Sequence, residues 1–123
     1  MTAVNRIIAI VDDDESVRRA LSRLVVSLSY QPADFSSGED FLDSLEANVP
    51  TCALLDLHMP GLNGLQVLEA MRARDMSIPT IVITANAQPE MRERCLEAGA
   101  VDYLQKPLER ELVFSVIRRA TGN

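Results

Sequence analysis

Short apolar runs alternate along the chain with segments in which apolar residues recur at every third or fourth position. The runs, bounded by Pro, Gly or charged residues, predict buried strands, and the wider spacing predicts amphipathic helices. The predicted strands are residues 6–11, 30–35, 52–56, 80–85 and 101–105. The predicted helices are residues 17–28, 39–45, 64–74, 89–98 and 108–120.

The apolar positions of the first and last helices predict which face of each is buried. The first helix is expected to bury Val17, Ala20, Leu21, Leu24, Val25 and Leu28. Its outer face is expected to carry Arg18, Arg19, Ser22 and Arg23. The last helix is expected to bury Leu112, Val113, Val116, Ile117 and Ala120. Pro32 has no main-chain N–H to donate, so the strand that contains it is expected at a sheet edge.

Five strands that alternate with five helices predict an α/β fold with a parallel sheet covered by helices on both faces. Right-handed crossover connections leave few arrangements of such a sheet. The arrangement expected for this chain length is the flavodoxin-like, doubly wound sheet with strand order 2-1-3-4-5. Strands 1 and 3 are then neighbours at the point where the winding reverses, and ligands of such sheets bind there, beyond the carboxyl ends of the strands.

Composition supports a single domain over residues 1–123, because the chain is 47% hydrophobic and 24% charged, as in globular proteins. Its formal net charge of −6 argues against direct binding of nucleic acid. The sequence contains no apolar run long enough to span a bilayer and no signal-peptide core, so a cytoplasmic protein without membrane contact is expected. Cys52 and Cys95 lack metal-ligand spacing and are expected to be buried free thiols.

Chemically distinctive side chains stand at the carboxyl ends of the predicted strands. They are Asp12 and Asp13 after the first strand, Asp56 at the end of the third, Thr84 in the fourth and Lys106 after the fifth. Because these ends meet at one sheet edge, the residues are expected to converge. Each alone has an ordinary explanation, such as a helix cap, a turn or a surface lysine. Their coincidence at four strand ends favours a functional site.

Three adjacent carboxylates repel one another unless a cation lies between them. Oxygen ligands without His or Cys suit Mg²⁺, which normally acts together with a phosphoryl group. Lys106 could hold such a group by its charge, and Thr84 could hydrogen-bond to it. A carboxylate in this setting can itself be the nucleophile and form an aspartyl phosphate. Asp56 is the best candidate, since it stands singly at the centre of the sheet.

Four segments together resemble the signature of bacterial response-regulator receiver domains of two-component signalling. They are Val11–Asp13, Leu55–Gly61 with Gly64, Ile83–Ala85, and Tyr103–Pro107. The resemblance covers essentially the whole chain and keeps the order and spacing of the family. Residues 35–42 and the last two helices are most similar to receivers of the FixJ type, which elsewhere precede a LuxR-type DNA-binding domain.

The resemblance implies that Asp56 is the phosphoacceptor, taking its phosphoryl group from the histidine of a sensor kinase. Asp13, Asp56 and the main-chain carbonyl of His58 would bind Mg²⁺ directly, while Asp12 would act largely through water. Mn²⁺ is expected to substitute for Mg²⁺. Lys106 would pair with the carboxylate or the phosphate of Asp56. The domain would be a phosphoacceptor in signalling rather than an enzyme, although it would assist its own phosphotransfer and dephosphorylation.

The resemblance also implies a conformational switch. Thr84 would turn towards the phosphate, and Tyr103 would follow from an outward to an inward rotamer. A cis peptide bond between Lys106 and Pro107 would position the lysine. His58 and Asn86 would tune the rates of phosphorylation and dephosphorylation. Residues 89–98, 101–105 and the last helix would form the surface read by an output domain, a partner protein or a second copy in a phosphorylation-induced homodimer.

Three other functions remain open. A flavodoxin-like FMN protein would need a phosphate-binding loop after the first strand, where this chain has acids, and would be coloured when purified. A Mg²⁺-dependent phosphatase acting through an aspartyl phosphate usually has its nucleophile after the first strand and a cap domain. It would turn over a small phosphate ester. A pseudo-receiver would bind a partner without being phosphorylated, and the complete set of site residues argues against it.

Overall fold

The computed structural model describes residues 5–122 and contains a five-stranded parallel sheet in the order β2-β1-β3-β4-β5. The strands are β1 (Ile7–Val11), β2 (Gln31–Phe35), β3 (Cys52–Asp56), β4 (Thr80–Thr84) and β5 (Asp102–Gln105). The helices are α1 (Glu15–Ser27), α2 (Gly38–Ser44), α3 (Gly64–Ala73), α4 (Pro89–Glu97) and α5 (Arg110–Thr121). The predicted fold class, strand order and edge position of β2 are confirmed. The predicted domain boundaries at residues 1 and 123 lie outside the described residues.

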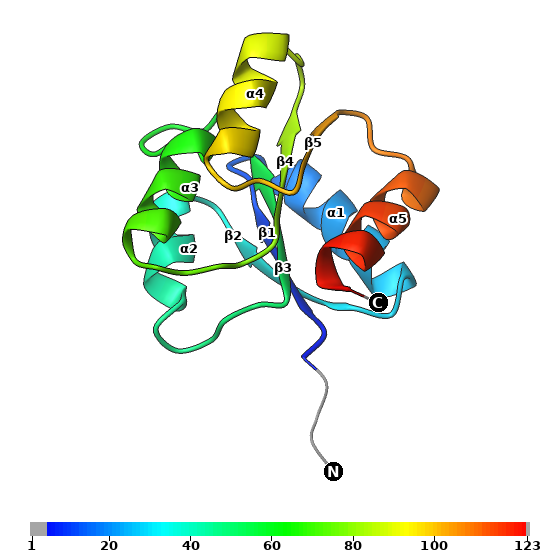
Figure 1. The fold of residues 1–123 in the computed structure, drawn as a ribbon. Coiled ribbons are helices and arrows are strands. Elements are labelled where there is room, and N and C mark those ends of the chain that lie inside the picture. Colours follow the sequence, from blue (N-terminus) through cyan, green and yellow to red (C-terminus); the bar gives the residue numbers. More distant parts are fainter. Residues whose placement is uncertain (1–4, 123) are drawn as a thin grey trace.

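Helices cover both faces of the sheet, with α1 and α5 on one face and α2, α3 and α4 on the other (Figure 1). Alternate residues of the strands therefore enter different cores. Ile8, Ile10 and Ile81 pack with α1 and α5, whereas Val11 and Val82 pack on the opposite face. Every residue of β3 and β4 is buried. This double coverage explains why the central strands are continuous apolar runs without alternation.

Three predictions about helix faces were wrong. Ala20 is exposed and Leu112 is 46% exposed, because α1 and α5 pack through narrower stripes than the sequence pattern suggested. In α5 the buried residues are Val113, Val116 and Ile117, and Leu112 lies about 100° around the helix from Val113. Arg18, predicted to face solvent, has a side chain only 16% exposed.

The start of α3 lies against the main chain that follows β3. The N–H of Gly64 donates to the carbonyl of Leu57 at 2.8 Å. A Cβ atom at Gly64 would lie 2.7 Å from the carbonyl oxygen of Asp56 and 2.9 Å from the Cα of Leu57. Only glycine allows this approach, because both neighbours are main-chain atoms that cannot rotate away. Asn63 and Gln66 form a capping box that fixes where the helix begins.

The two cysteines are buried and free, as predicted. Cys52 and Cys95 belong to the cores on opposite faces of the sheet. Burial raises the pKa of the Cys52 thiol to about 12, which keeps it protonated and unreactive at neutral pH. Across residues 5–122, no helix combines the length and the apolar character needed to cross a bilayer.

Candidate functional site

The residues predicted to converge lie at one edge of the sheet. Asp12 follows β1, Asp56 is the last residue of β3, Thr84 is the last residue of β4 and Lys106 follows β5. In the register of the sheet, Asp56 lies opposite Ile83, the residue before Thr84. Parallel pairing thus brings together side chains that are up to 94 positions apart in sequence.

Lys106 links two of the carboxylates. Its Nζ lies 3.1 Å from Oδ2 of Asp12 and 3.4 Å from Oδ1 of Asp56. Both aspartates are buried, while the lysine side chain is 26% exposed. The predicted partner of Lys106 was Asp56, through its carboxylate or its phosphate. The structure adds Asp12, whose contact with the ammonium is the shorter one.

Burial and, next, the negative charge of Asp12 raise the pKa of Asp56 to about 6, although the ammonium of Lys106 acts to lower it. Burial lowers the pKa of Lys106, but its hydrogen bond to Asp12 and the negative charges of Asp12 and Asp56 outweigh burial and raise it overall. At pH 7.5 the site therefore holds a charged but energetically costly Asp56 carboxylate beside a fully protonated lysine. An unstable carboxylate of this kind is suited to bonding with a cation or with an electrophile.

Oxygen atoms of Asp12, Asp13 and Asp56 all lie within 4.8 Å of one another. Asp13 is exposed and the other two are buried, so the cluster has one open side. A set of carboxylate oxygens without sulfur or imidazole suits a hard cation such as Mg²⁺ or Mn²⁺, which keeps several waters. The residues present therefore fit the cation that the sequence predicted. His58 is exposed and follows directly after Leu57, and the role of its carbonyl stays a prediction.

Thr84 and Tyr103, the predicted switch pair, are both buried. The Thr84 hydroxyl is bonded to the main chain of Asn86, accepting from its N–H at 3.2 Å and donating to its carbonyl at 3.3 Å. The Tyr103 hydroxyl is buried and has no hydrogen-bond partner among residues 5–122. Lys106 donates its main-chain N–H to the Thr84 carbonyl at 2.8 Å, and its peptide bond to Pro107 is cis.

The Tyr103→Phe variant is expected to be as stable as the wild type or more stable, by up to about 1 kcal/mol. Burying a hydroxyl without a partner costs roughly 1–3 kcal/mol, and phenylalanine keeps the ring while removing that hydroxyl. Urea unfolding followed by circular dichroism measures the difference. Tyr30→Phe serves as the matched aromatic control. A loss of more than 1 kcal/mol in Tyr103→Phe would mean that the hydroxyl does have a partner in solution.

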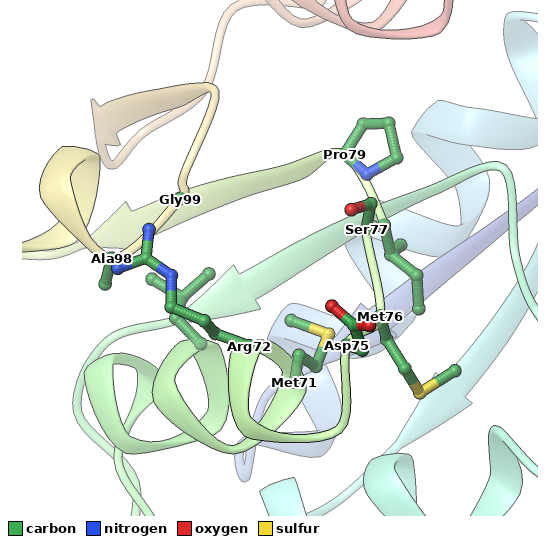
Figure 2. Close-up of a pocket in the computed structure, with 10 residues that line it drawn as sticks. Met71, Arg72, Asp75, Met76, Ser77, Pro79, Ala98 and Gly99 are labelled. Atoms are coloured by element: carbon green, nitrogen blue, oxygen red, sulfur yellow. The ribbon is translucent and has the colours of Figure 1, made fainter.

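A pocket of about 340 Å³ lies far from this edge, between the carboxyl ends of α3 and α4 and before the start of β4 (Figure 2). Figure 2 shows the side chains of Met71, Arg72 and Asp75 around it. Arg72 donates to the Glu97 carbonyl at 2.6 Å and so ties the two helices together here. None of the residues assigned to the site from sequence lines this pocket. The chemistry predicted from sequence therefore belongs to the opposite end of the sheet.

Sequence reasoning missed one residue beside the site. Arg18 donates from its Nη1 to the main-chain carbonyl of Asp12 at 2.8 Å and from its Nε to Asp34 at 3.3 Å. The helical period places position 18 on the outer face, but the long side chain folds back over the end of β1. The available signal was weak: an arginine one residue after the predicted helix start, and an acid near the end of the predicted neighbouring strand.

A family model described as the response regulator receiver domain matches residues 8–118. The chain is 34% identical over 114 residues to the DNA-binding transcriptional regulator NtrC of Klebsiella pneumoniae, covering 93% of this chain and 24% of that protein. It is 36% identical to the response regulator protein TodT of Pseudomonas putida, covering 93% of this chain and 50% of that protein.

Solved structures agree with the fold. The crystal structure of FixJ-N is 30% identical and superposes with a TM-score of 0.90 over 98% of this chain and 97% of that one. The FixJ type is thus one of several similar groups, together with NtrC and TodT. The chain spans about a quarter to a half of the length of these two curated relatives.

Proposed function

Because the chain belongs to the response regulator receiver domain family, we propose that it accepts a phosphoryl group on Asp56 from the histidine of a sensor kinase. The observation that supports this most directly is the buried Asp56 carboxylate, paired with Lys106 and adjacent to Asp12 and Asp13. In the proposed step, an oxygen of Asp56 attacks phosphorus, the phosphorus–nitrogen bond to the donor breaks, and an acyl phosphate forms.

Lys106 would neutralise charge on the phosphoryl group, moving its ammonium from the carboxylates to the new oxygens. Asp12, Asp13 and Asp56 would hold a Mg²⁺ or Mn²⁺ ion, with the His58 carbonyl as a further ligand. When bound, this ion would neutralise the negative charges of the carboxylates and the phosphoryl group. His58 and Asn86 are exposed at the rim and would tune access of water to the acyl phosphate.

The switch would start at Thr84. Its hydroxyl would exchange its bonds to the Asn86 main chain for a bond to the phosphoryl group, and Tyr103 would repack beside it. The surface formed by α4, β5 and α5 would carry the change to an output domain or a partner protein. A phosphorylation-induced homodimer through this surface would double the mass in light scattering, and an unchanged mass would contradict it.

Intact mass spectrometry after incubation with Mg²⁺ and a small acyl phosphate tests the proposed function. One phosphoryl group should be added in Mg²⁺, and none when EDTA is present. If the protein that gains this adduct is colourless, the flavin alternative is contradicted. If it also does not turn over phosphate esters, the phosphatase alternative is contradicted. A wild-type protein without an adduct would contradict phosphotransfer and leave the pseudo-receiver.

Adding Mg²⁺ is expected to raise the melting temperature of the wild type. An ion bound only by the folded state stabilises it by roughly 2.7 kcal/mol at a concentration one hundred times its Kd. Asp13→Asn should lose most of this shift, because the exposed carboxylate of the cluster becomes neutral. Asp43→Asn, an exposed change on α2, should keep it. Differential scanning fluorimetry measures the melting temperatures. Equal Mg²⁺-induced shifts in the two variants would place the ion elsewhere.

A further inference from the structure

Arg18 differs from its neighbour Arg19 in where its charge is placed. Arg19 is 61% exposed and pairs with Glu15 on the outside of α1. Arg18 is folded back along its helix, and its guanidinium lies between the Asp12 carbonyl and the Asp34 carboxylate. One side chain thus connects the end of β1 to β2, using the planar fork that arginine provides and lysine does not.

The carbonyl that Arg18 contacts belongs to the peptide unit joining Asp12 to Asp13. This unit is planar, so holding its oxygen restricts both ψ of Asp12 and φ of Asp13. The rest of Asp12 is also held: its N–H donates to the Phe35 carbonyl at 3.1 Å, and its Oδ1 accepts from the Asp14 N–H at 2.9 Å. The direction of the Asp12 and Asp13 carboxylates therefore depends on a peptide that Arg18 holds in place.

Charge explains why the arrangement needs Asp34. A bare guanidinium this close to a cation site would repel the cation, and its interaction with Asp34 offsets that repulsion. Groups that orient metal ligands without touching the metal commonly change its affinity by 10–100-fold when they are removed. Arg18 has the position and the bonding of such a group.

We propose that Arg18, held by Asp34, is a positioning residue that orients the Asp12–Asp13 peptide so that both carboxylates face a bound divalent cation. The proposal rests on the proposed function insofar as that function includes the cation. It goes beyond that function by adding a residue that touches neither the cation nor the phosphoryl group. Its effect is expected in the cation affinity itself, before any phosphoryl transfer.

The test measures the Kd for Mn²⁺ by electron paramagnetic resonance in the absence of any phosphodonor. Arg18→Met, which keeps the apolar stem, should weaken binding about tenfold. Arg18→Lys should weaken it comparably, because a single ammonium cannot serve both acceptors. Asp34→Asn should weaken it less. Arg19→Gln, the matched change on the outer face, should stay within about twofold of the wild type.

Melting temperatures in metal-free buffer separate positioning from general stability. A purely structural Arg18 would lower the melting temperature of its variants but leave the Kd for Mn²⁺ unchanged at temperatures where they are folded. Unchanged affinity in both Arg18 variants, with normal binding by the wild type, would overturn the role of Arg18 alone. A wild type that binds no Mn²⁺ would overturn the cation site of the proposed function and the role of Arg18 together.

Discussion

In metal-free buffer at pH 7.5, the Asp56→Asn variant is expected to be about 1–3 kcal/mol more stable to unfolding than the wild type. Burial and the charge of Asp12 raise the pKa of Asp56 from 3.8 to about 6 in the folded protein. One pKa unit corresponds to about 1.4 kcal/mol between protonation states, so a charged Asp56 costs the fold about 3 kcal/mol. That net cost already includes the attraction to Lys106, and asparagine removes it; imperfect hydrogen bonding of the buried amide accounts for the lower end of the range.

The stability gain should depend on pH in a defined direction. Because the folded pKa lies above the unfolded value, the folded state retains a proton on Asp56 that the unfolded state releases between about pH 4 and pH 6. The wild type therefore loses stability over this window as the pH rises, and Asp56→Asn does not. Urea unfolding in EDTA at pH 4, 5, 6 and 7.5 should show a difference that is near zero at pH 4 and largest above pH 6.

Asp40→Asn provides the control, because Asp40 is an exposed carboxylate on α2. Its stability relative to the wild type should change little with pH. A gain in Asp56→Asn that is equal at all four pH values would rule out the raised pKa as its cause. Asp56→Asn should also take up no phosphoryl group from a small acyl phosphate, and an adduct that persisted on this variant would place the acceptor on another residue.

Lys106→Met is expected to change stability in the opposite direction, lowering the free energy of unfolding by about 1–3 kcal/mol at pH 7.5. Removing one member of a fully buried ion pair costs about 3–5 kcal/mol, and the partial exposure of Lys106 reduces this figure. The loss arises because Asp12 and Asp56 would face each other without a cation between them. The free energy of unfolding is measured with urea in EDTA. Guanidinium chloride is unsuitable because it is itself a salt and screens the charges of the site.

A double-mutant cycle identifies which carboxylate the lysine stabilises. If Lys106 and Asp56 interact as their 3.4 Å separation indicates, Asp56→Asn should stabilise the Lys106→Met variant by more than it stabilises the wild type, because the charged Asp56 costs more without the ammonium. Arg23→Met, an exposed change on α1, should be close to neutral. Strict additivity of the two single changes would mean that Lys106 acts through Asp12 rather than Asp56.

Much of the fold and the site's membership could be predicted from sequence, because both follow from the order of strands. Once five parallel strands are arranged 2-1-3-4-5, the residues after Val11, Leu55 and Ile83 must meet at one edge. The pairing of Lys106 with Asp56 was predicted, but its closer contact with Asp12 could not be. The Nζ of Lys106 lies 3.1 Å from Asp12 and 3.4 Å from Asp56. Which of two such similar distances is the shorter depends on packing throughout the domain.

The errors at Arg18 and Leu112 show two things that a periodic pattern does not give. A periodic pattern gives the direction in which a side chain leaves the helix but not where its far end lies. Arginine is long enough to leave α1 outward and end over the sheet edge, which is where Arg18 is found. A periodic pattern also does not give the width of the buried face. The buried face of α5 consists of Val113, Val116 and Ile117, and Leu112 lies outside it.

The contact between Gly64 and the Asp56 carbonyl has a mechanical consequence. Elsewhere a layer of side chains separates helix from strand and can take up small movements by changing rotamers. At Gly64 no such layer exists, since there is not room even for a Cβ atom between the helix and the main chain of Asp56 and Leu57, and the Gly64 N–H bonds directly to the Leu57 carbonyl. The first turn of α3 is therefore a rigid extension of β3. A displacement of the main chain at Asp56 would move the first turn of α3 with it, so α3 would transmit movements of β3 and not absorb them.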